Sequence, residues 1–114
     1  MAEIEIIEAS DALTHVVLRG RLDVEGVEKV EAELAEQTVA RRKPVIVDIC
    51  AVEVLTSSGV GLLIKTARWM HSYGVIFGVV ATGLSKETLE RLKVDTIFPV
   101  VATYEDALRT LMLE

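Results

Sequence analysis

The sequence predicts an α/β fold in one domain over residues 1–114, with a mixed, mostly parallel sheet, an N-terminal hairpin and about four helices. The first observation is the run 45–49, where four of five residues are β-branched and one is polar. This pattern is typical of a strand covered on both faces. The second is a change to helical spacing from Val60 onward. The third is the alternation of strand-like and helix-like segments from residue 13, which indicates parallel strands joined by crossovers.

The chain begins with a predicted antiparallel hairpin. Residues 3–8 alternate charged and apolar side chains, residues 15–18 are largely apolar, and the polar turn 9–12 separates them. The segment Gly20–Asp23 ends the hairpin and leads into the first helix.

An acidic amphipathic helix is predicted from Val24 to about Ala40. Asp23 is placed to cap its free N–H groups. The basic residues 41–43 suit the negative C-terminal end of its dipole, and Pro44 stops it. The residues predicted to face inward are Val27, Val30 and Leu34.

The middle of the chain is predicted to form a strand, a loop and a helix. The strand 45–49 leaves the core around residues 48–50, and residues 51–55 connect it to a helix that begins near Thr56–Ser58. Gly74 ends this helix. Its predicted core face consists of Val60, Leu63, Ile64, Ala67 and Met70 or His71.

The last third is predicted to hold two strands and two helices. Residues 75–80 form a buried strand, and 97–101 form an edge strand, because Pro99 cannot donate to a ladder. Ser85 caps the short helix between them, and residues 103–106 match a capping box before the last helix. The predicted packing residues are Leu89 and Leu92 in the first of these helices, and Leu108, Leu111 and Met112 in the second.

Composition argues against several classes of protein. Twelve Lys and Arg against 18 Asp and Glu give a net charge of −6, which argues against a general nucleic-acid binder. One cysteine cannot form an internal disulfide, which fits a reducing compartment. The N-terminus lacks the pattern of a signal peptide, and the longest apolar stretch, residues 75–84, is too short to span a membrane. We therefore expect a cytoplasmic domain without membrane insertion.

Motifs for catalysis and for cofactor or metal binding are weak. Ser57 lacks the two flanking glycines of a G-x-S-x-G nucleophile, and neither His15 nor His71 is paired with a hydroxyl. The sequence contains neither G-x-x-x-x-G-K-[ST] nor a strand followed by G-x-G-x-x-G. Cys50 stands alone rather than among metal ligands. We expect no enzyme activity, no cofactor and no metal.

Hydroxyl residues gather where the middle helix begins, at Thr56, Ser57 and Ser58, followed by Gly59. One interpretation is a plain helix start, in which a hydroxyl caps the helix and the glycine packs closely. The other is a phosphoacceptor serine. A phosphoryl group adds about −1.5 to −2 charge, which a helix N-terminus tolerates well. A partner docked over the serine does not tolerate this charge. A loss of about 2.8 kcal/mol in binding free energy is enough to weaken a complex a hundredfold.

A stripe of large side chains is predicted along the same helix. Leu62, Trp69 and Tyr73 lie opposite the predicted core face, interleaved with Lys65 and Thr66. One interpretation is an exposed anchor for a partner protein. The other is that Trp69 folds down over a neighbouring helix.

Several segments in one order resemble the STAS domain, the family of sulfate-transporter cytoplasmic domains and bacterial anti-sigma factor antagonists. They are the hairpin, Gly20–Asp23, Val45–Asp48, Ser57–Gly59 and Ile97–Phe98. The resemblance covers essentially the whole chain and implies a regulatory binding module that works by partner switching. The unphosphorylated antagonist captures an anti-sigma factor that is also a serine kinase, and this frees the sigma factor. The phosphorylated antagonist releases the kinase, and a serine phosphatase resets it.

The family pattern is Asp-Ser-[Ser/Thr]-Gly, so the resemblance implies that Ser57 is the phosphoacceptor, with Gly59 as the family glycine and Asp23 as the family aspartate. Thr56 stands where the family has Asp, which removes a charge and adds a hydroxyl. Phosphorylation at Thr56 or Ser58, a divergent kinase, or no phosphorylation remain open. The expected partner-binding residues are Asp23, Thr56, Ser57, Ser58, Gly59, Leu62, Lys65 and Trp69.

Two other functions compete with this one. The first is a structural STAS subunit of an ABC-type lipid transport complex, without phosphorylation. The second is an enzyme or a nucleotide-binding protein, against which the missing phosphate loop argues.

Overall fold

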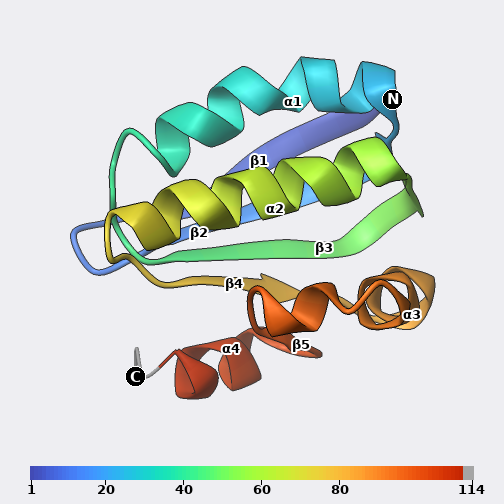
Figure 1. The fold of residues 1–114 in the computed structure, drawn as a ribbon. Helices are drawn as coiled ribbons and strands as arrows, with labels where there is room; N and C mark the ends of the chain where they lie inside the picture. Colours follow the sequence, from blue (N-terminus) through green and yellow to red (C-terminus); the bar gives the residue numbers. More distant parts are fainter. Residues whose placement is uncertain (112–114) are drawn as a thin grey trace.

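A five-stranded sheet in the order β1-β2-β3-β4-β5 forms the centre of the computed structural model, which describes residues 1–111 (Figure 1). The first two strands form the predicted antiparallel hairpin, and each later neighbouring pair is parallel. The strands are β1 (Ala2–Ala9), β2 (Thr14–Leu22), β3 (Val45–Leu55), β4 (Phe77–Val80) and β5 (Val100–Val101).

Helices cover both faces of this sheet. Two of them lie side by side on one face, and α4 packs on the other (Figure 1). The helices are α1 (Val24–Gln37), α2 (Ser57–Ser72), α3 (Gly83–Arg91) and α4 (Tyr104–Thr110), with a 3₁₀ turn, η1 (Val94–Thr96), after α3. The predicted fold class, a mixed and mostly parallel sheet with a leading hairpin and four helices, is confirmed.

The packing of β3 explains why four of its first five residues are apolar. Val45, Val47 and Ile49 belong to the main core with α1 and α2, whereas Ile46 belongs to a second cluster with residues of β4 and α4. Because successive side chains of a strand point to opposite faces, a strand covered on both faces needs an apolar residue at each position. This second cluster is Ile46, Val80, Ala107 and Leu111.

The predicted end of this strand is wrong. β3 does not end at residue 49 but continues to Leu55, paired with β2 from Arg19↔Ala51 to Leu22↔Leu55. The register shifts twice between the two strands, and near the first shift the Cys50 N–H donates to Asp48 Oδ1 at 2.8 Å. These irregularities interrupt the alternation of buried and exposed residues, so the sequence looked like a loop.

The first helix and its basic tail also differ from the prediction. α1 ends at Gln37 rather than near Ala40, and the buried Thr38 donates its hydroxyl to the Leu34 carbonyl at 2.6 Å. Contrary to the prediction, Arg41 does not interact with the C-terminal end of the α1 dipole. Its guanidinium donates to Thr14 Oγ1 at 2.7 Å and to a backbone carbonyl in the hairpin turn, and so ties the hairpin to the chain after α1.

The predicted boundaries near α3 need correction. The helix begins at Gly83 after Thr82, so Ser85 lies inside it and is buried rather than capping it. Leu89 is fully buried as predicted, but Leu92 is 54% exposed, because the helix ends there and Lys93 takes a left-handed conformation, φ 59°. The buried strand is shorter than predicted, at Phe77–Val80.

The C-terminal elements agree better with the sequence. β5 is confirmed as an edge strand but is short, Val100–Val101, and begins just after Pro99. Thr103 caps α4, since its Oγ1 accepts the Asp106 N–H at 3.0 Å. Leu111 is buried and Leu108 is half-buried, whereas Met112 lies outside the described residues.

Candidate functional site at the start of α2

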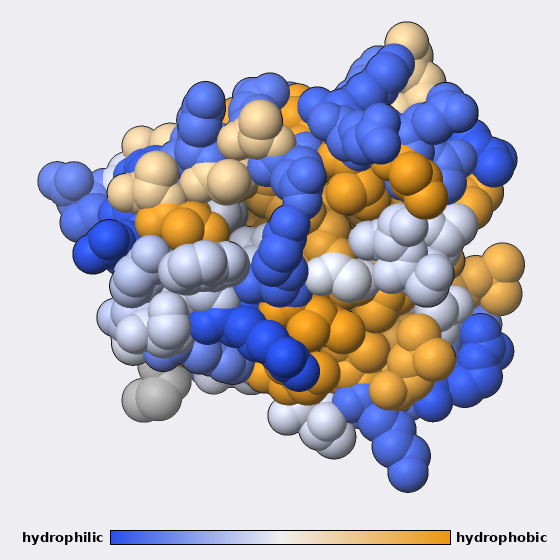
Figure 2. All heavy atoms as spheres, turned by 45° about the horizontal axis from the view of Figure 1, so that its top comes forward, coloured by the Kyte–Doolittle hydropathy of each residue, from blue (hydrophilic) through white to orange (hydrophobic). Residues whose placement is uncertain are grey.

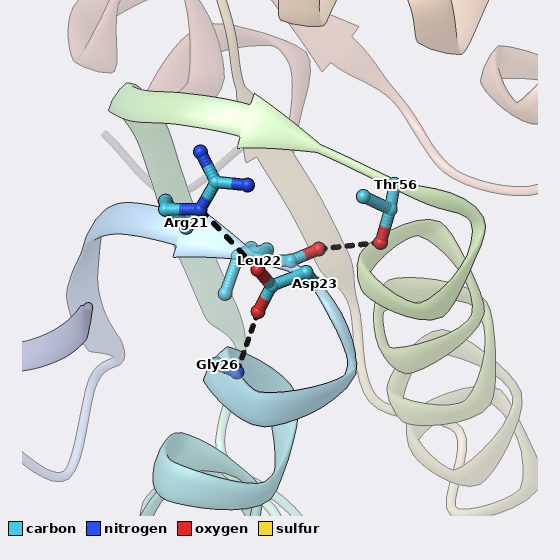
Figure 3. Close-up of polar contacts among 5 residues, drawn as sticks. All are labelled: Arg21, Leu22, Asp23, Gly26 and Thr56. Carbon is cyan, nitrogen blue, oxygen red and sulfur yellow. Dashed lines mark hydrogen bonds and ion pairs between the residues drawn. The ribbon is translucent and has the colours of Figure 1, made fainter.

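The site lies where β2 and β3 end and two helices begin. α1 follows β2 and α2 follows β3, so both helix N-termini lie at the same end of the sheet (Figure 1). The Leu22 carbonyl joins them: it accepts the Thr56 backbone N–H at 3.2 Å and the Thr56 hydroxyl at 2.8 Å (Figure 3). Two bonds across 34 residues of sequence therefore fix the start of α2 against the end of β2.

Two glycines allow this close approach. A Cβ on Gly59 would lie 2.8 Å from both the Leu22 carbonyl oxygen and the Leu22 Cβ. A Cβ on Gly26 would lie 1.8 Å from the Arg21 carbonyl oxygen. Both helices therefore begin against the backbone of β2, at a distance that excludes any side chain.

The start of α1 is closed by Asp23, which is confirmed as its cap. Asp23 Oδ1 accepts the Gly26 N–H at 2.9 Å, and the Arg21 Nε donates to Asp23 Oδ2 at 3.3 Å (Figure 3). The hydrogen bond from Gly26 and then the Arg21 guanidinium lower the pKa of Asp23 below its ordinary value. A fixed negative charge therefore occupies this helix start at neutral pH.

The start of α2 is open. Thr56 holds the capping position, but its hydroxyl donates to Leu22, and among residues 1–111 no side chain caps the helix. Ser57 is the first residue of α2 and is exposed, and Ser58 is half-buried. The exposed Ser57 thus lies at the positive end of a 16-residue helix whose first N–H groups have no side-chain acceptor in the described part of the chain.

Two exposed apolar side chains lie in the first turns of the other helices, α1 and α3. Val24, the first residue of α1, is 60% exposed, and Leu84, the second residue of α3, is 81% exposed. Figure 2 looks onto the layer of α1 and α2 and shows its largest continuous apolar area right of centre, towards the end where both helices begin. Neither residue was predicted from the sequence to belong to a site. The feature of the sequence that could have identified them is an apolar residue in the first turn of a helix, outside the stripe that faces the core.

The predicted stripe along α2 is not continuous. Leu62 is 4% exposed and belongs to the main core, because α1 lies alongside α2 and covers this flank as well. Thr66 is also buried, and its hydroxyl donates to the Leu62 carbonyl at 2.8 Å. Lys65 is exposed but forms an ion pair with Glu31 of α1. Leu62 is therefore corrected from a partner-binding residue to a core residue.

Trp69 forms a separate cluster near the far end of α2. Its side chain is 51% exposed, so it does not fold down over a neighbouring helix. Its ring lies 6.2 Å from that of Tyr73, and the Arg42 guanidinium lies 4.0 Å from the Tyr73 ring centroid. At 1.5 Å of rise per residue, Trp69 lies about 18 Å along the helix from Ser57. The aromatic cluster and the serine therefore belong to different surfaces.

The two histidines lie away from the serine. His15 is at the start of β2 and stacks on Tyr104 of α4 with ring centroids 4.3 Å apart, and burial lowers its pKa. His71 is exposed in the last turn of α2. Within residues 1–111, no group of three or more His, Cys, Asp or Glu side chains is placed to hold a metal ion. None of the helices in this range has the length and apolar character of a membrane span.

The chain belongs to the STAS domain family, whose sequence model matches residues 3–107. No curated protein sequence matches it. Among solved structures, it is similar to an anti-sigma factor antagonist from Mycobacterium paratuberculosis, with a TM-score of 0.87 and 27% identity over 98% of this chain and 95% of that one. A second similar structure is a putative anti-sigma factor antagonist from Thermotoga maritima, with a TM-score of 0.84 and 15% identity over 96% and 94%.

The fold is also shared with a relative solved in a phosphorylated form. The Bacillus cell fate determinant SpoIIAA in that form has a TM-score of 0.69 and 17% identity over 95% of this chain and 98% of its own. The family resemblance seen in the sequence is therefore confirmed, and the structural neighbours are anti-sigma factor antagonists.

Proposed function

We propose that this chain is a cytoplasmic anti-sigma factor antagonist that acts as a binding module rather than an enzyme. It captures an anti-sigma factor serine kinase through Asp23, Thr56–Ser58 and the apolar residues beside them. Gly59, which the sequence predicted as a contact, is buried against β2 and does not reach a partner. The similarity to the Mycobacterium paratuberculosis antagonist over nearly the whole chain supports this class of partner. The single observation that carries the proposal is the exposed Ser57 at an uncapped helix N-terminus.

Phosphorylation of Ser57 is the proposed switch. The kinase transfers the γ-phosphoryl group of ATP to Ser57 Oγ, the hydroxyl proton leaves to a base, and ADP is released. The uncapped N–H groups of α2 favour the new dianion, so the domain stays folded. The docked kinase would have to bury that dianion without a partner, which costs far more than the hundredfold weakening that a switch needs. A serine phosphatase hydrolyses the phosphoserine and restores the binding form.

Ser57 is a better acceptor than its neighbours on geometric grounds. Thr56 is half-buried and its hydroxyl is already engaged with the Leu22 carbonyl, and Ser58 is half-buried. The bond to Leu22 also gives Thr56 a structural role at the position where the family has Asp.

The test is binding of the cognate kinase to Ser57→Asp and Ser57→Ala, with Ser58→Ala as the matched control. We expect Ser57→Ala and Ser58→Ala to bind like the wild type and Ser57→Asp to bind at least tenfold more weakly. Intact-mass analysis after incubation with the kinase and ATP is expected to show one added phosphoryl group, lost in Ser57→Ala. Equal affinity of Ser57→Asp and Ser57→Ala would remove the switch.

Thr56 stands where the family pattern has Asp, and this difference favours one alternative function. The alternative is a non-phosphorylated STAS subunit of an ABC-type lipid transport complex. Copurification with an ATPase subunit, together with no change in mass on incubation with kinase, would favour it over the antagonist.

A further inference from the structure

β3 has an unpaired edge beyond the end of β4. Its last pair with β4 is Asp48↔Val80, after which the chain leaves β4 and enters α3. On the other side, β3 stays paired with β2 as far as Leu55. Within residues 1–111, the part of β3 from Ile49 to Leu55 therefore has a strand neighbour on one edge only, and Figure 1 shows β3 extending past the arrowhead of β4.

This free edge forms one wall of a groove of about 490 Å³, and the start of α3 forms the other. Leu84 stands on the α3 side, and Glu53 is the charged residue of the lining. The apolar lining residues are Val52, Val54, Leu55 and Leu84. Hydroxyl groups of α3 and its cap and the thiol of the exposed Cys50 complete the walls.

The backbone groups of a free strand edge indicate what kind of molecule binds there. The edge presents backbone N–H and C=O groups of alternate residues, which an extended polypeptide can satisfy in a row. A second copy of β3 does not fit this description, because α3 stands beside the edge in each copy. The open edge of β1 is less suited to an added strand, since Glu3, Glu5 and Glu8 lie along that strand.

We propose that this groove binds an extended segment of a partner protein, which adds to β3 as a sixth strand beside residues 49–55. Apolar side chains of the segment alternate towards Val54 and Leu84, and a basic side chain faces Glu53, in keeping with the net charge of −6. The partner is the protein that docks over Ser57, because the groove ends at Leu55 and Thr56 follows directly. This identification of the partner rests on the proposed function, whereas the binding of an extended segment does not.

Peptide binding tests the groove without the kinase. Random 12-residue peptides displayed on phage are selected on the immobilised wild-type chain, and the selected peptides are synthesised and their affinities measured by fluorescence anisotropy. We expect sequences that alternate apolar residues and carry a basic residue. Leu84→Lys is expected to weaken them at least tenfold, because it removes an apolar contact and repels the basic residue. Leu92→Lys is the matched control, since it makes the same change in an exposed leucine at the other end of α3, and we expect it to change affinity less than twofold.

Backbone pairing is tested by amide hydrogen exchange on the same complexes. We expect protection of amides between residues 51 and 55 when peptide binds. The groove proposal is overturned if selection yields no peptide, if peptides bind Leu84→Lys as tightly as the wild type, or if they protect β1 instead.

The link to the kinase is tested separately. We expect Leu84→Lys to weaken kinase binding while Leu92→Lys does not. Peptides that bind the groove, together with full kinase affinity of Leu84→Lys, would overturn the identification of the partner but leave the groove. Full kinase affinity of Ser57→Asp would instead overturn the switch, so the two failures are distinguishable.

Discussion

The starts of α1 and α2 are neighbours, yet their free N–H groups are treated differently. At α1, the Asp23 carboxylate accepts the Gly26 N–H and places a negative charge on the helix end. At α2, Thr56 occupies the same position, but its hydroxyl donates to the Leu22 carbonyl (Figure 3). The N–H groups beside the exposed Ser57 are therefore left uncapped. A capping residue type therefore does not establish that a helix is capped. The direction in which its side chain is bonded decides whether an anion can bind there.

The largest expected effect comes from filling the space where the two helices meet β2. Gly26→Ala places Cβ 1.8 Å from a backbone carbonyl oxygen, and Gly59→Ala places it 2.8 Å from another. Overpacking costs about 1–3 kcal/mol and occasionally more. We expect the free energy of unfolding in urea to fall by about 3 kcal/mol in Gly26→Ala and by about 2 kcal/mol in Gly59→Ala.

Gly61→Ala is the matched control, because within residues 1–111 a Cβ there meets no atom within 4 Å beyond its chain neighbours and the nearby backbone of α2. It is expected to raise the free energy of unfolding by about 0.5–1 kcal/mol, since alanine suits a helix interior better than glycine. If Gly59→Ala were as stable as Gly61→Ala, the close junction between α2 and β2 would be wrong.

Removing the Thr56 hydroxyl has the next largest effect. Thr56→Val keeps the side-chain shape but leaves the Leu22 carbonyl with the backbone N–H as its donor. We expect the free energy of unfolding to fall by about 1 kcal/mol. Thr56→Ser retains the donor and is expected to lose less. Identical losses in the two variants would show that the hydroxyl bond does not stabilise the junction.

The charge at the start of α1 predicts a dependence on pH. The pKa of Asp23 is lower in the folded state, so the stability that its carboxylate contributes is present above the ordinary Asp pKa of about 3.9 and is lost as pH falls through the folded-state pKa. Urea unfolding at a series of pH values should show wild type more stable than Asp23→Asn at neutral pH, with the difference shrinking in acid. A difference that stays constant with pH would contradict the role of the charge.

The smallest expected effect on the free energy of unfolding comes from placing a negative charge at one or the other end of α2. Ser57→Asp places a negative charge at the uncapped N-terminus and Ser72→Asp places one in the last turn. Charges near helix ends contribute about 0.3–1 kcal/mol. We expect Ser57→Asp to raise the free energy of unfolding slightly at low ionic strength and Ser72→Asp to lower it. A destabilised Ser57→Asp would mean that a phosphoryl group there disturbs the fold as well as a partner.

Local signals in the sequence predicted the elements that depend on neighbouring residues. Asp23 and Thr103 cap their helices as predicted, and α2 begins at Ser57 and ends just before Gly74, whose φ is +70°. Caps and left-handed glycines act within a few residues, so they can be recognised without the fold.

Local signals misplaced elements where distant segments intervene. Residues 51–55 looked like a loop, but pairing with β2 makes them a strand. Leu62 looked exposed, because a helical pattern shows the stripe that faces the sheet and does not show that α1 covers a second flank. Leu92 lies three residues after Leu89, the spacing of one helix face, but α3 ends at Arg91, so Leu92 does not share the buried face.

The sequence by itself determined the fold class and the family, because the order of strand-like, helix-like and motif segments can be followed along the chain. It also determined the position of Ser57 at a helix start, because that depends on residue types at short spacing. The tertiary structure alone decided that this helix start is open. That outcome depends on the Leu22 carbonyl, 34 residues away, which accepts the hydrogen bond of the Thr56 hydroxyl. It also decided that β3 keeps a free edge, since that depends on where β4 ends rather than on any residue of β3. Properties set by nearby residues can be found in a sequence, whereas those set by a distant backbone group require the fold.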